Sequence, residues 1–145
     1  MKFYLGVHET FFMERTNVPL FISYHRLRRN PNLDRQPRCE WSLDSGGFTE
    51  IAKHGEWTIT PEDYIQDVGR YMDWGGLDWA APPDWMVEPH MVEQTGLSVA
   101  EHQRTTVAHF LFLTDTAPDL PFTPVHHSVP LRQNYPYMTT STPTI

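Results

Sequence analysis

The stretch Trp41-Ser42-Leu43-Asp44-Ser45-Gly46-Gly47-Phe48-Thr49 decides how the rest of the sequence is interpreted. Trp41 and Leu43 alternate with polar residues, which is typical of a short strand entering a core. An acid and a hydroxyl follow, and then two glycines, which can adopt backbone angles barred to other residues. Such a turn lets the main chain approach a ligand while Asp44 projects from the end of the strand. In parallel α/β proteins that end carries the chemistry; the alternative is an ordinary strand followed by a Gly-Gly loop.

Strands and helices are predicted to alternate along the chain. Strands are predicted at residues 3–7, 20–24, 77–81 and 121–125, in addition to the one that ends at Asp44. A helix is predicted over residues 60–73, because Thr60 can cap it and Pro61 suits its first turn. A second helix begins at the capping box Ser98-Val99-Ala100-Glu101 and runs to residue 114, whereas residues 9–18 are predicted to form a loop. The alternation predicts an α/β fold with a parallel sheet and crossover helices.

Length and composition exclude several classes of protein. The 145 residues suffice for one domain with a modest core. No apolar run approaches the roughly 20 residues that span a bilayer, and the first residues lack the apolar stretch of a signal peptide. We therefore expect a cytoplasmic protein with no membrane partner. Cys39 is the only cysteine, so neither a disulfide framework nor a cysteine zinc cluster can form within the chain.

Basic residues are concentrated in one short segment. The net charge of −7 argues against binding nucleic acid through overall charge. However, the segment before Glu40 holds a single acid, Asp34, and five arginines: Arg26, Arg28, Arg29, Arg35 and Arg38. Arg26, Arg28 and Arg29 are candidates for holding the phosphates of a nucleic acid. The alternative is a solvated surface with no ligand.

Asp44-Ser45-Gly46-Gly47-Phe48 resembles the Asp-Ser-Gly-Gly-Phe/Tyr signature of the tRNA-guanine transglycosylases, also called queuine tRNA-ribosyltransferases. The surrounding chain is most similar to phage and bacterial relatives that insert deazapurines into DNA. Downstream, Thr60-Pro61-Glu62 resembles the family's Ser/Thr-Pro-Glu helix start, and Asp78 and Asp84 have the spacing of two family acids. The resemblance implies the N-terminal portion of a (β/α)8 TIM barrel of about 250 residues, with parallel strands and crossover helices.

The resemblance also implies a pocket for a purine base. Asp84 would read the base, because an ionised carboxylate only accepts hydrogen bonds and the N1–H and N2–H₂ edge of guanine only donates them. Asp44 would be catalytic, contacting the base and helping to move protons. The other residues of the signature would bind substrate with Asp84: Ser45, Gly46, Gly47 and Phe48. The alternative is that Pro-Pro-Asp is a plain turn with Asp84 as a cap.

The two aspartates are expected at the same end of the sheet, facing one pocket. Two carboxylates that share a poorly solvated pocket repel each other, so at least one should have a raised pKa. Gly46 and Gly47 would form the floor of this cleft, with an aromatic side chain such as Phe48 or Trp85 as a wall. Trp79 and Trp85 would flank the pocket and stack on a base, although tryptophans are more often core residues.

The resemblance covers residues 1–125 as a partial barrel domain, and residues 126–145 read as an irregular tail outside the family pattern. His126-His127 stands where the family has a Gln-Gly pair. A shifted reading frame or a shortened gene after Val125 is the expected cause, which the coding DNA can test. The family's carboxylate nucleophile and zinc ligands come later, so no cofactor is expected here and zinc only in a full-length relative. Open sheet edges would favour self-association.

Three functions remain open. The first is a transglycosylase that exchanges guanine for a 7-deazapurine in DNA or tRNA and is incomplete here, so its own activity is uncertain. The second is a non-catalytic remnant, or a module that binds the base or a partner. The third is an unrelated metal-dependent barrel hydrolase that uses Asp44, Asp84 and His126. The first is favoured, because adjacent histidines on a strand face opposite ways and no metal-ligand spacing is present.

Overall fold

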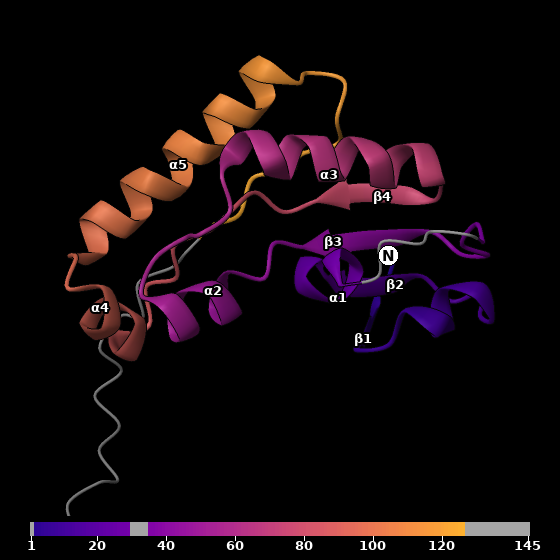
Figure 1. Cartoon of the computed structure of the whole chain (residues 1–145), viewed down its shortest axis with the longest axis horizontal. Helices are drawn as coiled ribbons and strands as arrows, with labels where there is room; N and C mark the ends of the chain where they lie inside the picture. Colours follow the sequence, from indigo (N-terminus) through magenta and orange to yellow (C-terminus); the bar gives the residue numbers. More distant parts are fainter. Residues whose placement is uncertain (1, 30–34, 127–145) are drawn as a thin grey trace, which may run out of the picture.

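The computed structural model describes residues 2–29 and 35–126 and is built on a parallel sheet (Figure 1). Within the described residues the sheet has four strands, which lie side by side in chain order: β1 (Leu5–Val7), β2 (Leu20–Ser23), β3 (Trp41–Asp44) and β4 (Leu77–Ala80). The helical segments are η1 (Thr10–Glu14), α1 (Tyr24–Arg28), α2 (Gly47–His54), α3 (Pro61–Trp74), α4 (Pro89–Thr95) and α5 (Val99–Thr116). The fold is α/β, with helices between parallel strands, as in part of a TIM-barrel-like fold.

The register of the sheet brings the carboxyl ends of the strands to one edge. Asp44, the last residue of β3, lies opposite Ser23, the last residue of β2. The chain leaves this edge into α1 after β2 and toward α2 after β3, and in Figure 1 the strands point toward α2 and α4. Loops at this edge of a parallel sheet are the usual place for ligands.

Both predicted long helices are confirmed, together with their caps. In α3 the Thr60 hydroxyl accepts a hydrogen bond of 3.1 Å from the Asp63 main-chain N–H, and Pro61 is the first helical residue. In α5 Ser98 and Glu101 form the expected capping box. These signals were reliable because a cap involves only residues three positions apart.

Helices α1, α2 and α4 lie in segments for which no helix is predicted. The expected Gly-Gly loop is instead the start of α2: Gly46 is the N-cap, with φ of +81°, and Gly47 is the first helical residue. A positive φ is costly for residues with a side chain, so Gly46 permits this tight entry. The segment predicted as a loop over residues 9–18 contains the 3-10 helix η1.

The predicted strand over residues 121–125 is wrong as a full strand. Its only sheet pairing within the described residues is a parallel bridge between Ala80 and Phe122. The Ala80 N–H donates to the Pro121 carbonyl at 2.9 Å, and the Thr123 N–H donates to the Ala80 carbonyl at 3.0 Å. Pro121 and Pro124 have no N–H to donate, which limits a continuous ladder.

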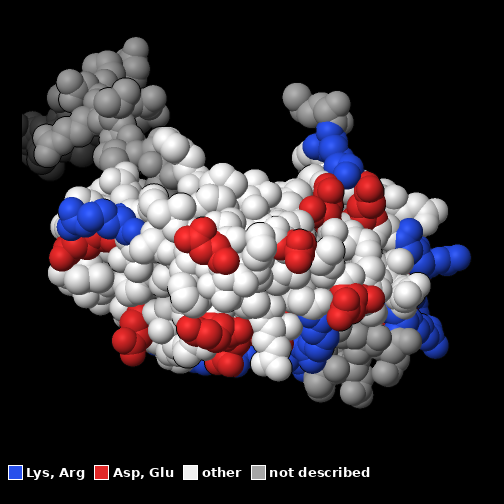
Figure 2. Space-filling model, turned by 90° about the horizontal axis from the view of Figure 1, so that it is seen from above, with Lys and Arg blue, Asp and Glu red and all other residues white. Residues whose placement is uncertain are grey.

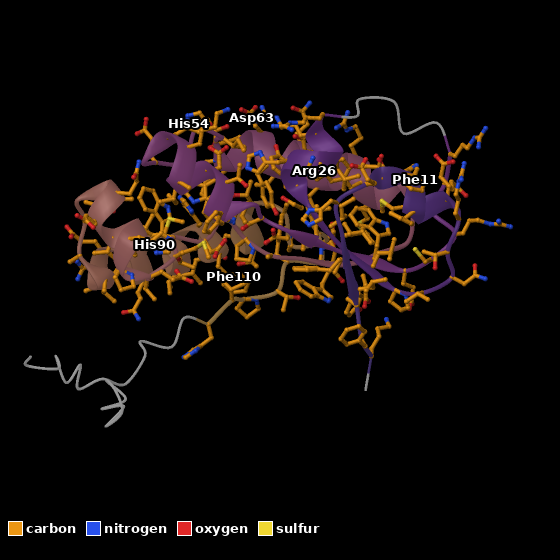
Figure 3. All side chains as sticks on the ribbon, turned by 90° about the horizontal axis from the view of Figure 1, so that it is seen from below. Phe11, Arg26, His54, Asp63, His90 and Phe110 are labelled. Atoms are coloured by element: carbon orange, nitrogen blue, oxygen red, sulfur yellow. The ribbon has the colours of Figure 1, made fainter. Side chains whose placement is uncertain are left out.

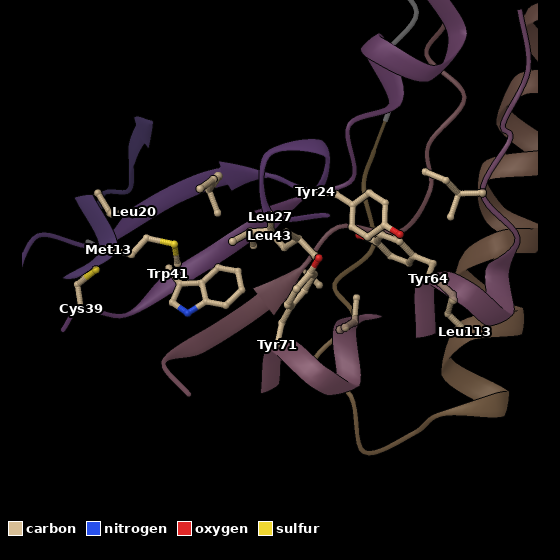
Figure 4. Packing of buried hydrophobic residues seen from close by; sticks show 14 residues of the cluster. Met13, Leu20, Tyr24, Leu27, Cys39, Trp41, Leu43, Tyr64, Tyr71 and Leu113 are labelled. Carbon is tan, nitrogen blue, oxygen red and sulfur yellow. The ribbon is translucent and has the colours of Figure 1, made fainter. Parts of the chain in front are cut away.

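The core lies between the sheet and helices α1 and α3, with Trp41 at the end of the cluster where Met13 and Cys39 also lie (Figure 4). Trp41 is fully buried, and its Nε1–H donates to the Gly75 carbonyl at 2.9 Å. Its ring meets the rings of Tyr71 and Trp74 edge-on, at centroid distances of 6.1 and 5.9 Å. Helix α3 packs on β4 and on α5. Strand β3 is also held against α3, because Trp41, one of its alternate apolar residues, contacts Tyr71 and Trp74.

The surface carries charge of both signs. On the face shown in Figure 2, acidic side chains are spread along the molecule and basic ones lie mostly toward its ends. Attraction of a polyanion therefore has to come from a local cluster of basic side chains rather than from this face as a whole. None of the helices formed by residues 2–29 and 35–126 is long and apolar enough to cross a membrane.

Candidate functional site

Asp44 lines a hollow of about 260 Å³ at the carboxyl edge of the sheet. The side chain is half-buried and follows directly on β3. The other residues that line the hollow are His8, Ser23, His25, Arg26, Arg29 and Thr49. This volume falls just below the roughly 300–1,000 Å³ of pockets for drug-sized ligands, which suits a single small ring system.

Asp84 lies against the turn that follows Asp44. The Ser45 hydroxyl donates to Asp84 Oδ1, and the Trp57 Nε1–H donates to the Asp84 carbonyl at 3.1 Å. A Cβ atom on Gly47 would be 2.6 Å from Asp84 Oδ1 and 2.7 Å from the Asp84 carbonyl oxygen. Only glycine at position 47 permits this approach, so the signature turn holds Asp84 beside Asp44.

Asp44 lies in a poorly solvated place within reach of the charge of Asp84, but Asp84 itself is not among the residues that line the hollow. Burial raises the pKa of Asp44, and the charge of Asp84 raises it further; a hydrogen bond with the Gly46 main chain only partly offsets these effects. Burial also raises the pKa of Tyr64, to which the charges of Asp44 and Asp84 both add. The expectation of a raised aspartate pKa is therefore confirmed for Asp44.

Replacing Asp44 with asparagine is expected to raise the melting temperature at neutral pH. A carboxyl whose pKa is raised in the folded state stabilises the fold below its unfolded pKa, and this contribution is lost as pH rises through the folded pKa. Asparagine removes the charge and keeps an oxygen that can accept from the Gly46 N–H. Thermal unfolding of both proteins across the acid range measures the effect.

The matched control is Asp119→Asn, because Asp119 is exposed. We expect this variant to follow the pH profile of the wild type. A lower melting temperature of Asp44→Asn at neutral pH would show that the Asp44 charge does not oppose folding.

Two residues that sequence reasoning missed, His25 and Glu50, lie beside the same turn. The ring of His25 packs on Gly46, where a Cβ atom would be 2.9 Å from His25 Nε2. His25 Nε2 lies 3.3 Å from Glu50 Oε1. The other oxygen of Glu50 accepts from the Thr58 N–H at 2.8 Å and from the Thr58 hydroxyl at 2.7 Å. The only hint in the sequence was the position of His25 next to the arginines.

The comparison with known families agrees with this arrangement. The family described as DpdA, DeoxyPurine in DNA protein A, matches residues 1–138. The chain belongs to the DpdA family. This is a family of deazapurine-insertion transglycosylases that act on DNA, as the resemblance of the chain around the signature turn implied. The match passes the boundary predicted at Val125 into residues that lie outside the described part of the chain. No curated protein and no solved structure matches the chain.

Two of the three arginines proposed for nucleic-acid binding lie at the hollow of this DpdA protein. Arg26 and Arg29 line it, and they also line a neighbouring hollow of about 240 Å³ together with His8, Glu9 and Thr10. Figure 3 shows Arg26 on α1. Arg28 differs: its Nε is 4.0 Å from Asp67, and its guanidinium lies over the Tyr24 ring. On a helix, residues three apart lie on the same face, as Arg26 and Arg29 do, whereas residues one or two apart do not. Arg28 therefore lies on a different face from the other two.

The expected aromatic wall is wrong, because none of the three aromatic candidates lines the Asp44 hollow within the described residues. The other predicted substrate-binding residues do not line it either: Ser45, Gly46, Gly47 and Asp84. Phe48 is 56% exposed on α2, and its ring lies against His90 of α4. Trp85 packs edge-on against His102, and Trp79 packs on Phe21. Gly46 and Gly47 act instead by letting His25 and Asp84 come close to the turn.

The described residues were considered as metal ligands. In the described ranges, no group of three or more His, Cys, Asp or Glu side chains is arranged to hold a metal ion. His126 is exposed, and Cys39 is packed in the core. Asp78, the first of the two acids with the family spacing, accepts a hydrogen bond of 2.8 Å from Lys2 Nζ, and this bond lowers the pKa of Asp78. His127 lies outside the described residues.

Proposed function

We propose that the chain binds the purine base that is exchanged when guanine in DNA is replaced by a 7-deazapurine. The single observation that carries the proposal is that Asp44 lines a hollow at the carboxyl edge of the sheet while Asp84 is held against the turn that follows Asp44. Family membership supports DNA as the polymer.

Asp84 is the group that reads the base. Its side chain is held by the Ser45 hydroxyl and its main chain by the Trp57 N–H, so the carboxylate is oriented before a ligand arrives. An ionised carboxylate accepts from the N1–H and N2–H₂ groups that guanine and 7-deazaguanine share. Hydrogen bonds to a charged group are worth about 1.5–3 kcal/mol each, which suffices for selective binding.

Asp44 is the group that moves a proton. Because its pKa is raised, Asp44 holds its proton at a higher pH than an ordinary aspartate does. The carboxyl group can then donate a proton to a leaving base and accept one from an entering base. Substitution at C1′ of the sugar also requires a nucleophile, and we assign none among the described residues. The contribution of these residues is to bind the base and to handle its protons.

Arg26 and Arg29 are proposed to hold a phosphate next to the base. Both are exposed and line the hollow that Asp44 lines. A bidentate guanidinium suits a phosphate oxygen pair. The placement gives the acidic chain a local positive site for DNA at the mouth of the base-binding hollow.

Base binding is tested by titrating guanine and 7-deazaguanine into the purified chain in a calorimeter. We expect Asp84→Asn to weaken binding of both bases about 10- to 100-fold, from the loss of about 1.5–3 kcal/mol of charged hydrogen bonding. The matched control is Asp78→Asn, which should leave the affinity unchanged because Asp78 pairs with Lys2. Exchange of labelled guanine into DNA is measured in parallel.

The outcomes separate the candidate functions. Binding together with exchange of guanine supports a transglycosylase, and binding without exchange supports a base-binding module. A folded protein that binds neither base would overturn the proposed function. If Asp84→Asn and Asp78→Asn lowered the affinity for the bases equally, Asp84 would not be the residue that reads the base.

A further inference from the structure

His25 and Glu50 form a buried pair whose chemistry the proposed function does not use. His25 lies in the first turn of α1, and Glu50 lies in α2. His25 lines the hollow that also holds Asp44. Its Nε2 is buried and makes no hydrogen bond within the described residues, although Glu50 Oε1 lies 3.3 Å away. The two side chains are therefore close to each other but are not hydrogen-bonded.

The carboxylate of Glu50 is fixed in place. Its residue is 3% exposed, and Thr58 donates to it through both the main-chain N–H and the hydroxyl. Burial raises the pKa of Glu50, but the two hydrogen bonds from Thr58 oppose burial, and the pKa is lowered from its ordinary value. Glu50 is therefore an anion at neutral pH.

The imidazole of His25 is neutral under the same conditions. Burial lowers its pKa; the Glu50 charge and the Gly46 main chain oppose this, and the charges of Arg29 and Arg28 add to it. A neutral imidazole carries one proton, on Nδ1 or on Nε2. Because Nε2 faces an anion, the proton belongs on Nε2, which leaves Nδ1 as an acceptor.

The ring orientation directs that acceptor away from the turn. Cδ2 and Nε2 lie against Gly46, so Nδ1 and Cε1 form the opposite edge of the ring. The hollow offers charged donors in Arg26 and Arg29 and the carboxyl group of Asp44, and a base presents further N–H groups that each need an acceptor. An oriented neutral imidazole supplies such an acceptor.

We propose that His25, oriented by Glu50, contacts the bound purine and accepts a hydrogen bond from one of its N–H groups through Nδ1. This rests on the proposed function, since it names a further residue that touches the same base. His25 thereby adds a neutral acceptor to the two carboxylates. Glu50 is a positioning residue that acts through the His25 ring.

The test compares two substitutions of His25 by calorimetry with guanine and 7-deazaguanine. His25→Phe keeps a ring and removes both nitrogens, so we expect about 3- to 10-fold weaker binding, the effect of one hydrogen bond between neutral groups. His25→Asn places an amide oxygen near the former Nδ1, and we expect it to retain most of the affinity. Circular dichroism checks that each variant is folded.

A second measurement follows the tautomer directly and needs no substitution of His25. In ¹⁵N-labelled wild type, we expect His25 to be protonated on Nε2, and its Nδ1 signal to shift when 7-deazaguanine binds. Glu50→Gln should mix the two tautomers, which a merely structural role of Glu50 would not do. If His25→Phe fails to fold, this measurement decides the matter.

Failure of the inference is distinguishable from failure of the proposed function. If the folded wild type binds neither base, the proposed function falls and this inference with it. If the wild type binds base but His25→Phe binds it equally well, or the His25 nitrogen signals do not move, only the role of His25 is overturned.

Discussion

Replacing Trp41 with alanine is expected to lower the free energy of unfolding by about 3–5 kcal/mol, the range for removing a large buried aromatic side chain. Trp41 is fully buried, where it packs edge-on against Tyr71 and Trp74. The substitution leaves a cavity between β3 and α3 and strips the Gly75 carbonyl of the N–H that it accepts from. Urea unfolding followed by far-ultraviolet circular dichroism measures the loss, since fluorescence would change with the tryptophan itself.

Trp79→Ala provides the matched control, because it removes the same side chain from a neighbouring strand. Trp79 is only half-buried and packs on Phe21, which is itself half-buried, rather than in the main core. We expect a clearly smaller loss of stability than for Trp41→Ala. A Trp79→Ala variant that is destabilised as much as Trp41→Ala would show that the principal core lies on the other face of the sheet.

The parts of the fold that could be predicted from sequence depend on signals that are local in the chain. The strand that ends at Asp44 follows from alternate apolar residues, and the helix starts at Thr60 and Ser98 follow from caps that act within one turn. The parallel order follows because strands and helices alternate. Each of these rules needs at most a few neighbouring residues.

The helices that could not be predicted depend on contacts between distant segments. Helix α2 packs against α4, and a helix of only eight residues is marginal without such packing. Its two leading glycines have low helix propensity and read as a loop. In the structure Gly46 supplies the backbone angle that enters the helix, and Gly47 makes room for Asp84. Tertiary contact therefore overrides local propensity at the signature turn.

The candidate site likewise has one part that could be predicted from the sequence and one part that could not. Asp44 and Asp84 come together because the carboxyl ends of neighbouring parallel strands share one edge, a rule that needs no side-chain detail. Arg28 was grouped with Arg26 only because α1 was not predicted, and a helix turns the two away from each other. His25 and Glu50 meet across two helices that the sequence did not predict, so no spacing in the chain could pair them.

Replacing Gly47 with alanine is expected to lower the free energy of unfolding by about 1–3 kcal/mol, as overpacking of a tight site does, and to weaken binding of guanine. Gly47 is a helical residue, and in open space alanine would be the better helix former. Here the new Cβ would lie 2.7 Å from the Asp84 carbonyl oxygen, which is main chain and cannot swing aside. Asp84 must therefore move, and with it the carboxylate that we propose reads the base.

Gly69→Ala is the control that separates this clash from helix propensity. Gly69 lies inside α3, and a Cβ there would meet nothing within 4 Å. We expect this variant to gain about 0.5–1 kcal/mol, the usual preference for alanine over glycine within a helix, and to bind guanine as the wild type does. Urea unfolding and calorimetry of both variants test the pair. Should both glycine substitutions stabilise the fold and leave guanine binding intact, Gly47 would not be the residue that lets Asp84 reach the base-binding turn.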